Sequence, residues 1–280
     1  MEKIKISEQL LLRFRNFLFE DEKSSATVEK YMRDLKIFAE FIKDGVLDKQ
    51  KLLEYKSKLV KDYMVSSANS MIAALNSFLG FIGHRELCIK RFRVQRDAYC
   101  SEKKELTRDE YMRLVETAKK NNNRRLCLIL QTICATGIRV SELQYITVDA
   151  VMRSEAIVNC KGKNRRIFIV SKLRGKLMNY IKEEKLTGGA IFVTRRGKPM
   201  SRNNIWREMK NLCYDADVSP DKVFPHNLRH LFARTFYGIE KDIAKLADIL
   251  GHTSIDTTRI YIVTSGTEHK RKMETMRLIL

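Results

Sequence analysis

Apolar residues in the first third of the chain recur at the three-and-four spacing of a buried helix face. Val28, Leu35 and Phe38 lie on one such face, and the serine pair before them can cap the helix. A further helix is expected over residues 47–63. Repeated patterns of this kind, with no convincing strand among them, predict four helices between residue 6 and about residue 83. The chain therefore begins with a small helical domain.

A second domain is predicted to begin at Thr107, because a glutamate follows three residues later in the pattern of a helix capping box. A strongly apolar helix comes next and is expected to stop at Gly137. Between the two domains the helical pattern fails and basic residues gather. We therefore predict domains over residues 1–95 and 106–280, joined by a basic linker over residues 96–105.

Strand-like alternation is confined to the second domain. Residues 156–158 and 167–170 flank the turn residues 160–164, which predicts a β-hairpin with a basic tip. A helix, a short strand at 191–193 and a serine-capped helix over 201–214 are expected to follow. The predicted fold class is α-helical in the first domain and mixed α/β, mainly helical, in the second.

The charge balance narrows the choice of partner. Lysine and arginine number 54 against 34 aspartates and glutamates, a formal net charge of +20. So much positive charge favours a polyanion, with nucleic acid first and a membrane surface second. No run of 18 apolar residues and no secretion signal is seen. The six cysteines show no paired spacing, which indicates reduced thiols in a cytoplasmic protein.

Residues 224–261 hold the side chains with the most suggestive chemistry. His226 and Arg229 lie one helical turn apart, so both can direct donors at one anion. His252 follows a Leu-Gly pair, and Tyr261 ends a segment that begins with serine and threonine. Taken alone, each has an ordinary explanation: helix-start histidine, cap residue or packed tyrosine.

Taken together with Arg139 and a hairpin lysine, these residues form a complete set for cleaving a DNA phosphodiester. Two forked guanidinium groups, Arg139 and Arg229, suit the charge on the non-bridging oxygens of a pentavalent phosphorus. A tyrosine of ordinary pKa near about 10 needs cationic surroundings to act as a nucleophile. Lys161 or Lys163 can protonate the departing sugar oxygen, and the histidines can bind the phosphate or move a proton. This scheme needs no metal and no other cofactor.

Four blocks of sequence also carry a family resemblance. They read ATGIRVSEL at 135–143, PHNLRH at 225–230, LGH at 250–252 and TTRIY at 257–261. In this order and spacing they resemble the signature of the tyrosine recombinases, the phage-integrase and Xer-like enzymes. The resemblance covers essentially the whole chain and looks like the two-domain members that bind only core sites.

The resemblance implies a role for each matching residue. Tyr261 would be the nucleophile, Glu142 would support the site, and the hairpin lysine aligns best with Lys161, with Lys163 a close rival. The implied catalytic set is Arg139, Lys161, His226, Arg229, His252 and Tyr261. Basic residues predicted to bind DNA are Lys90, Arg91, Arg93, Arg96 and Lys163, for which a solvated basic loop is the alternative.

The resemblance further implies an architecture and a reaction. A four-helix, SAM-like core-binding domain and the catalytic domain would close as a clamp on double-stranded DNA with inverted-repeat core sites. Cleavage would leave a 3′-phosphotyrosyl bond and a free 5′-hydroxyl, within a homotetramer. The tail from Thr264 onward would dock on a neighbouring protomer, or else fold back on its own domain. The alternative functions are a non-catalytic DNA-binding protein of the same fold and a type IB topoisomerase.

Overall fold

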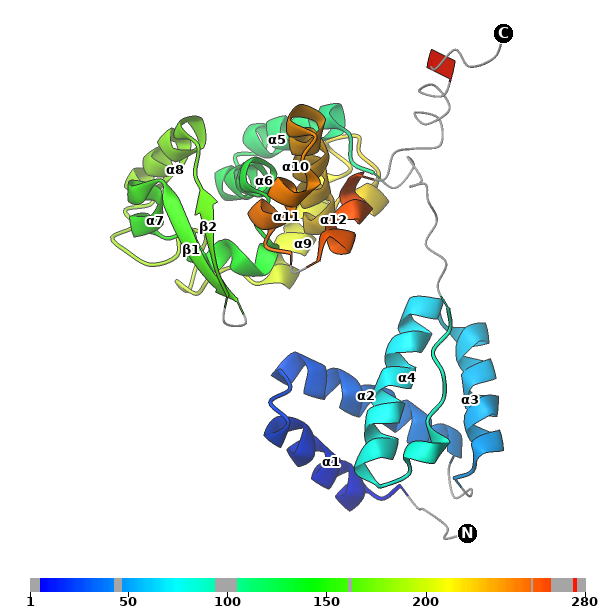
Figure 1. Ribbon diagram of the computed structural model, residues 1–280. Coiled ribbons are helices and arrows are strands. Elements are labelled where there is room, and N and C mark those ends of the chain that lie inside the picture. The colour runs from blue at the N-terminus through cyan, green and yellow to red at the C-terminus, as the bar shows by residue number, and fades with distance from the viewer. Residues whose placement is uncertain are drawn as a thin grey trace. The chain divides into compact units, whose positions relative to one another are not determined.

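The chain divides into two units, residues 1–96 and 97–280, in the computed structural model drawn in Figure 1. The structure describes residues 6–42, 47–93, 105–160, 163–252, 254–262 and 274–275. The predicted linker over 96–105 therefore lies almost wholly outside the described residues, as does nearly all of the tail after Tyr261. The domain boundaries drawn from the sequence stay a prediction.

The first unit is helical, as predicted. Its elements are α1 (Glu8–Glu20), α2 (Ser25–Ile42), α3 (Lys49–Asp62), α4 (Val65–Phe81) and the short 3-10 helix η1 (Arg85–Leu87). Ser24 of the serine pair caps α2, since its hydroxyl accepts a hydrogen bond from the Thr27 amide at 3.3 Å. Asp48 caps α3 in the same way, at 2.7 Å from the Lys51 amide. The helix expected over 47–63 is thus confirmed within two residues at its start and one at its end.

Aromatic side chains hold the centre of this unit together. Phe14 of α1 meets Phe78 of α4 edge to face at 5.3 Å between ring centroids. Phe38 of α2 and Tyr55 of α3 pack at 4.8 Å. All four rings are buried, and each such ring contributes roughly 2 kcal/mol or more through the surface it removes from water. The core therefore joins all four helices.

The second unit is mainly helical with one small sheet. Its elements are α5 (Arg108–Lys120), α6 (Arg124–Thr136), η3 (Val140–Tyr145), α7 (Val148–Arg153), β1 (Glu155–Cys160), β2 (Lys163–Phe168), α8 (Ser171–Glu183), α9 (Arg202–Leu212), η4 (Pro220–Lys222), α10 (Pro225–Glu240), α11 (Ile243–Leu250) and α12 (Ile255–Ile262). The capping box at Thr107 is present at the start of α5. Gly137 ends α6 in the left-handed conformation, as predicted.

Gly137 is also a point of close approach between two helices. A Cβ atom placed on it would lie 2.5 Å from the ring of Phe232 on α10. Only glycine leaves that space free and takes the positive φ of 63° without strain. Because α10 carries His226 and Arg229, this contact helps to set both next to the segment that follows α6.

The predicted hairpin is an antiparallel pair in which Val158 of β1 faces Arg165 of β2. Val158 and Ile167 point into the core, so alternate residues of each strand face inward. The strand expected at 191–193 is wrong. The structure has an isolated bridge between Val193 and Pro199 there, and residues 191 and 192 are both buried, a pattern that lacks the alternation of a half-buried strand.

The second serine-capped helix, predicted over 201–214, is α9 and ends two residues early. Ser201 does cap it, accepting a hydrogen bond from the Asn204 amide at 3.2 Å. Tyr214 lies beyond its end and is 94% exposed. No helix within the described ranges is long and apolar enough to cross a membrane. The cysteines whose side chains are described are free thiols: Cys88, Cys127, Cys134 and Cys213.

Candidate active site

Apart from the hairpin lysine, the predicted catalytic residues come from four segments of the second unit. Arg139 precedes η3 and Glu142 lies within it, while Arg229 is on α10. His252 lies just after α11 and Tyr261 is near the end of α12. Helix α10 contacts α6, α11 and α12, so residues more than 100 positions apart in the sequence meet in one region.

Arg229 is the most buried charged residue of the region, at 1% exposure. Its Nη1 donates to the Gly137 carbonyl, and its Nη2 donates to the Leu250 carbonyl at 2.7 Å. Nη2 also lies 3.0 Å from Nε2 of His252. The pKa of Arg229 is lowered to about 10, chiefly by burial and also by Arg139, while Tyr261 opposes the shift. Arg229 therefore stays a cation at neutral pH, fixed between the ends of α6 and α11.

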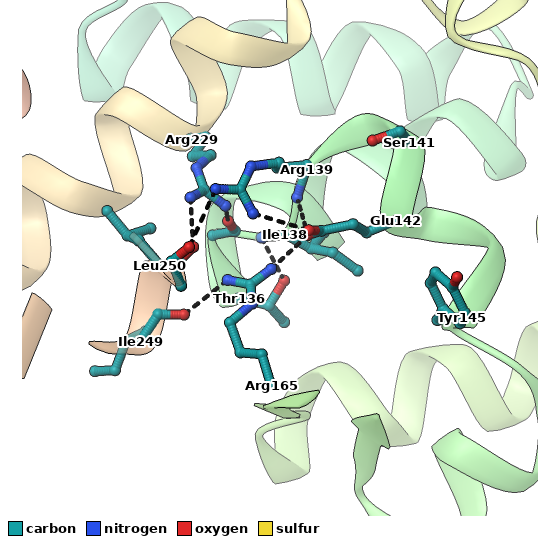
Figure 2. A network of polar contacts seen from close by, with 12 residues as sticks. Thr136, Ile138, Arg139, Ser141, Glu142, Tyr145, Arg165, Arg229, Ile249 and Leu250 are labelled. Carbon is teal, nitrogen blue, oxygen red and sulfur yellow. Dashed lines mark hydrogen bonds and ion pairs between the residues drawn. The ribbon is translucent and has the colours of Figure 1, made fainter. Parts of the chain in front are cut away.

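Arg139 is held through Glu142, as Figure 2 shows. One carboxylate oxygen accepts from Nη1 of Arg139 at 2.9 Å, and the other accepts from the Arg139 backbone amide at 2.9 Å. Arg165 of β2 donates to that second oxygen as well. The carboxylate is buried between two guanidinium groups, while the Arg139 side chain keeps 38% of its surface exposed. Glu142 thus holds Arg139 in place and leaves part of its side chain accessible.

Arg165 links this carboxylate to the end of α11. Its Nη1 donates to the Ile249 carbonyl at 2.7 Å. The Arg165 side chain packs against Gly251, because a Cβ added to Gly251 would lie 2.6 Å from Arg165 Cδ. Gly251 has a φ of +66° and is the C-cap of α11. The path of Arg165 therefore fixes η3 against the turn that presents His252.

The ring of Tyr261 is enclosed by histidines. Tyr261 is only 6% exposed. The ring of His252 stacks on it at 5.5 Å between centroids, with 13° between the planes. His230 packs edge-on at 4.4 Å, and His226 lies at 5.7 Å. Three imidazoles and one phenol thus share one small region beside Arg229.

The pKa of each of the three imidazoles lies below the usual value of histidine. Burial of the ring is the largest cause of the lowered pKa in each case. The pKa of His252 falls to about 4 and that of His230 to about 4, with nearby Arg229 adding to both. The pKa of His226 is also below its usual value, with Arg229 and Arg139 contributing.

The tautomer of His252 follows from its partners. A guanidinium can only donate, so Nε2 of His252 accepts from Arg229 and the ring proton is on Nδ1. Nδ1 then donates to the Thr258 hydroxyl at 2.8 Å. Thr258 is buried and lies one turn before Tyr261 on α12. Through this chain of contacts, Arg229 is connected to the helix that carries the tyrosine.

Of the two hairpin lysines, the structure describes only the backbone of Lys163. Lys161 lies outside the described residues. Lys163 is the first residue of β2, and its side chain is not described. No three histidine, cysteine, aspartate or glutamate side chains within the described ranges gather as metal ligands would.

The basic residues predicted to bind DNA belong to the first unit, except Lys163. Arg96 lies outside the described residues. Lys90, Arg91 and Arg93 are exposed on a segment, residues 88–93, that we call the basic strap. Nothing in its sequence pattern suggested that it would be held in place.

Two asparagines of α4 bind the backbone of the basic strap. Asn76 accepts from the Ile89 amide at 3.0 Å and donates to its carbonyl at 2.8 Å. Asn69 does the same for Phe92, at 2.7 and 3.0 Å. Lys56 lies 4.6 Å from the centre of the Phe92 ring. The strap is thus fixed to α4, with its cationic side chains pointing outward.

Arg165, Thr258 and His230 were missed as site residues by sequence reasoning. A signal existed for Arg165, because it occupies an inward-facing position of β2, where a charge requires a buried partner. Thr258 and His230 lie inside the blocks that carry the family resemblance. Their spacing gave no sign of contact with His252 or Tyr261.

Comparison with known proteins decides the family. The model of the phage integrase family matches residues 104–267. Tyrosine recombinase XerD of Staphylococcus epidermidis is 30% identical over 94% of this chain and 96% of that protein. XerA of Pyrococcus furiosus is 28% identical over 98% and 96%. The chain belongs to the phage integrase family of tyrosine recombinases. It is a site-specific recombinase, so the predicted family and enzyme class are confirmed.

Solved structures agree on the fold of this recombinase. XerH bound to difH substrate in a pre-cleavage complex has a TM-score of 0.69 at 18% identity, covering 96% of this chain and 97% of that one. A lambda integrase tetramer bound to a Holliday junction has a TM-score of 0.71 at 19% identity, covering 90% and 76%. The predicted fold class is confirmed.

Proposed function

We propose that this recombinase cuts DNA by attack of Tyr261 on a phosphodiester. The phenolic oxygen forms a bond to phosphorus, and the bond to the 5′ oxygen breaks. The products are a 3′-phosphotyrosyl bond and a free 5′-hydroxyl, and the 5′-hydroxyl of a partner duplex reverses the step to join new strands. The energy of the bond is kept throughout, so the scheme uses neither ATP nor a metal.

The observation that carries this proposal is the surroundings of the Tyr261 ring. The ring is buried among His226, His230 and His252, and His252 is bonded directly to Arg229. Tyr261 also packs on the apolar residues Ala233, Leu246 and Leu250, but its contacts with imidazoles place a residue type that can accept a proton beside the phenol. His226 is the exposed member of the three, and we assign it the role of proton acceptor.

The two arginines supply the donors for the phosphate oxygens. Nε of Arg229 is buried without a hydrogen-bond partner among the described residues, so it has a donor to offer a ligand that enters. A lost hydrogen bond of this kind costs about 1–3 kcal/mol, and a phosphate oxygen would remove that cost. Arg139 donates from Nη1 to Glu142 and, at 3.4 Å, from Nη2 to the Gly251 carbonyl, and its partly exposed side chain contributes the second fork. Lys161, with Lys163 as its rival, protonates the leaving oxygen.

The wider assembly is inferred from the relatives. The lambda integrase structure is a tetramer on a Holliday junction, and the XerH structure holds its difH site. By this likeness the protein acts as a homotetramer on double-stranded DNA. We further propose that the DNA carries inverted-repeat core sites and that the tail from Thr264 onward docks on the neighbouring protomer. The basic strap and Lys163 bind phosphates in that complex.

The test is covalent trapping on DNA. A duplex site, selected by binding from a random pool, is nicked near the scissile phosphate so that the cleaved end escapes. Wild-type protein then accumulates a DNA adduct on a denaturing gel, and Tyr261→Phe forms none while binding normally. The control Tyr214→Phe makes the same chemical change at an exposed position and keeps full trapping. Trapping that persists in Tyr261→Phe contradicts the assignment, and relaxation of supercoiled DNA lacking the site indicates a topoisomerase.

A further inference from the structure

His230 contacts two residues of the proposed active site, His226 and Tyr261. It lies on α10, four residues after His226, so the two side chains share one face of the helix. The His230 ring is 4.6 Å from that of His226 and 4.4 Å from that of Tyr261, in edge-to-face geometry with both. His226 and Tyr261 are farther from each other, at 5.7 Å. The His230 ring therefore contacts both of the other rings.

We propose that His230 is a positioning residue for the nucleophile, and that the flat ring, not a nitrogen atom, is what it supplies. The inference rests on the proposed role of Tyr261. In this arrangement the edge of one ring meets the face of the other, which is the favoured packing of aromatic groups. The contact restricts the rotation of the Tyr261 side chain and keeps its oxygen aimed in one direction.

The other two imidazoles are placed for different tasks. His252 already exchanges hydrogen bonds with Arg229 and Thr258. His226 is exposed at the start of α10, where a phosphate or a proton can reach it. His230 is partly buried, and its pKa of about 4 keeps it uncharged at pH 7. A neutral ring held against two others is suited to packing, and the same surroundings oppose the charged form that acid catalysis would require.

The size of the effect follows from what positioning contributes to a reaction. A displacement of about 1 Å of a reacting group can lower a rate by about 100-fold. Loss of the His230 ring leaves the Tyr261 ring with the more distant contacts to His252 and His226, so its oxygen samples more directions. We expect the cleavage rate to fall by about 10- to 100-fold, with DNA affinity unchanged, because the lost contact is internal.

Two substitutions separate the ring from its nitrogens. His230→Phe keeps a flat ring and removes both nitrogens, and His230→Asn keeps polar groups and removes the ring. The rate constant of covalent trapping is measured at saturating nicked DNA, together with DNA affinity and the melting temperature of the full chain. We expect His230→Phe to cleave within about threefold of wild type and His230→Asn to fall by about 10- to 100-fold, both with normal affinity.

The opposite order of rates overturns the inference. A slow Phe variant beside a fast Asn variant means that a nitrogen atom is needed, and two variants at wild-type rate mean that His230 has no role. Phe236→Leu, on the same helix and in the same cluster of packed side chains as Tyr261, shows what loss of stability alone does to the rate. If it slows cleavage as much as His230→Asn does at an equal drop in melting temperature, positioning is refuted. Trapping by Tyr261→Phe in the same assay refutes the role of Tyr261 itself.

Discussion

Gly251→Ala tests whether the network around Arg165 is rigid. Gly251 has a φ of +66°, and an alanine Cβ there would lie 2.6 Å from Cδ and 3.0 Å from Nε of Arg165. The positive φ alone costs a non-glycine residue about 1–2 kcal/mol. Arg165 cannot move aside freely, because its Nη1 donates to the Ile249 carbonyl and its Nη2 donates to Glu142. Loss of one of those bonds adds about 1–3 kcal/mol.

The matched control is Gly197→Ala. Gly197 has a φ of +73° with no atom within 4 Å of an added Cβ, so it carries only the backbone cost. We expect Gly251→Ala to lose roughly 2–5 kcal/mol and Gly197→Ala roughly 1–2 kcal/mol, measured as unfolding free energies in urea. Because His252 follows directly, Gly251→Ala should also slow covalent trapping, and Gly197→Ala should not.

Equal losses in the two variants would refute the reasoning. They would mean that Arg165 gives way at no cost and that its contacts do not fix the turn before His252. If Gly251→Ala is strongly destabilised but traps DNA at the normal rate, the contact between Gly251 and Arg165 contributes to stability and does not affect the active site.

Three further predictions concern the phosphate contacts. Arg229→Lys should lower cleavage by about 10²- to 10³-fold in the trapping assay, because the three donors of one ammonium nitrogen cannot serve two carbonyls, His252 and a phosphate as the forked guanidinium can; near-normal trapping would contradict the forked contact. A substrate with a 5′-bridging sulfur, whose leaving group hardly needs a proton, should restore cleavage to Lys161→Ala; rescue of Lys163→Ala alone would move the general acid to that residue. Asn69→Leu and Asn76→Leu should weaken DNA binding but leave the slope of log affinity against log salt concentration unchanged. Removal of one cation of the basic strap should reduce that slope by about 0.9. Unchanged affinity in both leucine variants would mean that the strap need not be held by α4.

Local signals in the sequence predicted the parts of the structure that depend on near neighbours. The capping box at Thr107 and the stop at Gly137 each involve residues within a few positions, and both are present. The hairpin followed from alternation alone. The strand expected at 191–193 failed because an apolar run does not reveal whether a partner strand is available.

The contacts missed from the sequence join distant positions. Arg165 bonds a carbonyl 84 residues away, and Asn69 binds the backbone 23 residues on. Neither contact leaves a periodic pattern in the sequence, because each joins a single side chain to the backbone of one distant residue. The candidate site residues were predicted from motifs that reflect chemistry, whereas His230 was missed because packing against Tyr261 depends on how α10 and α12 cross.

The most direct test of the central claim is the chemical identity of the DNA adduct. Trypsin should release residues 260–270 from the trapped protein, since Arg259 precedes this segment and Lys270 ends it, and Tyr261 is the only tyrosine within it. After nuclease digestion, mass spectrometry should find this peptide carrying a nucleotide joined through its 3′ phosphate to Tyr261, with a free 5′-hydroxyl on the other DNA end. A nucleotide on any other residue, or a linkage through a 5′ phosphate, would contradict the account.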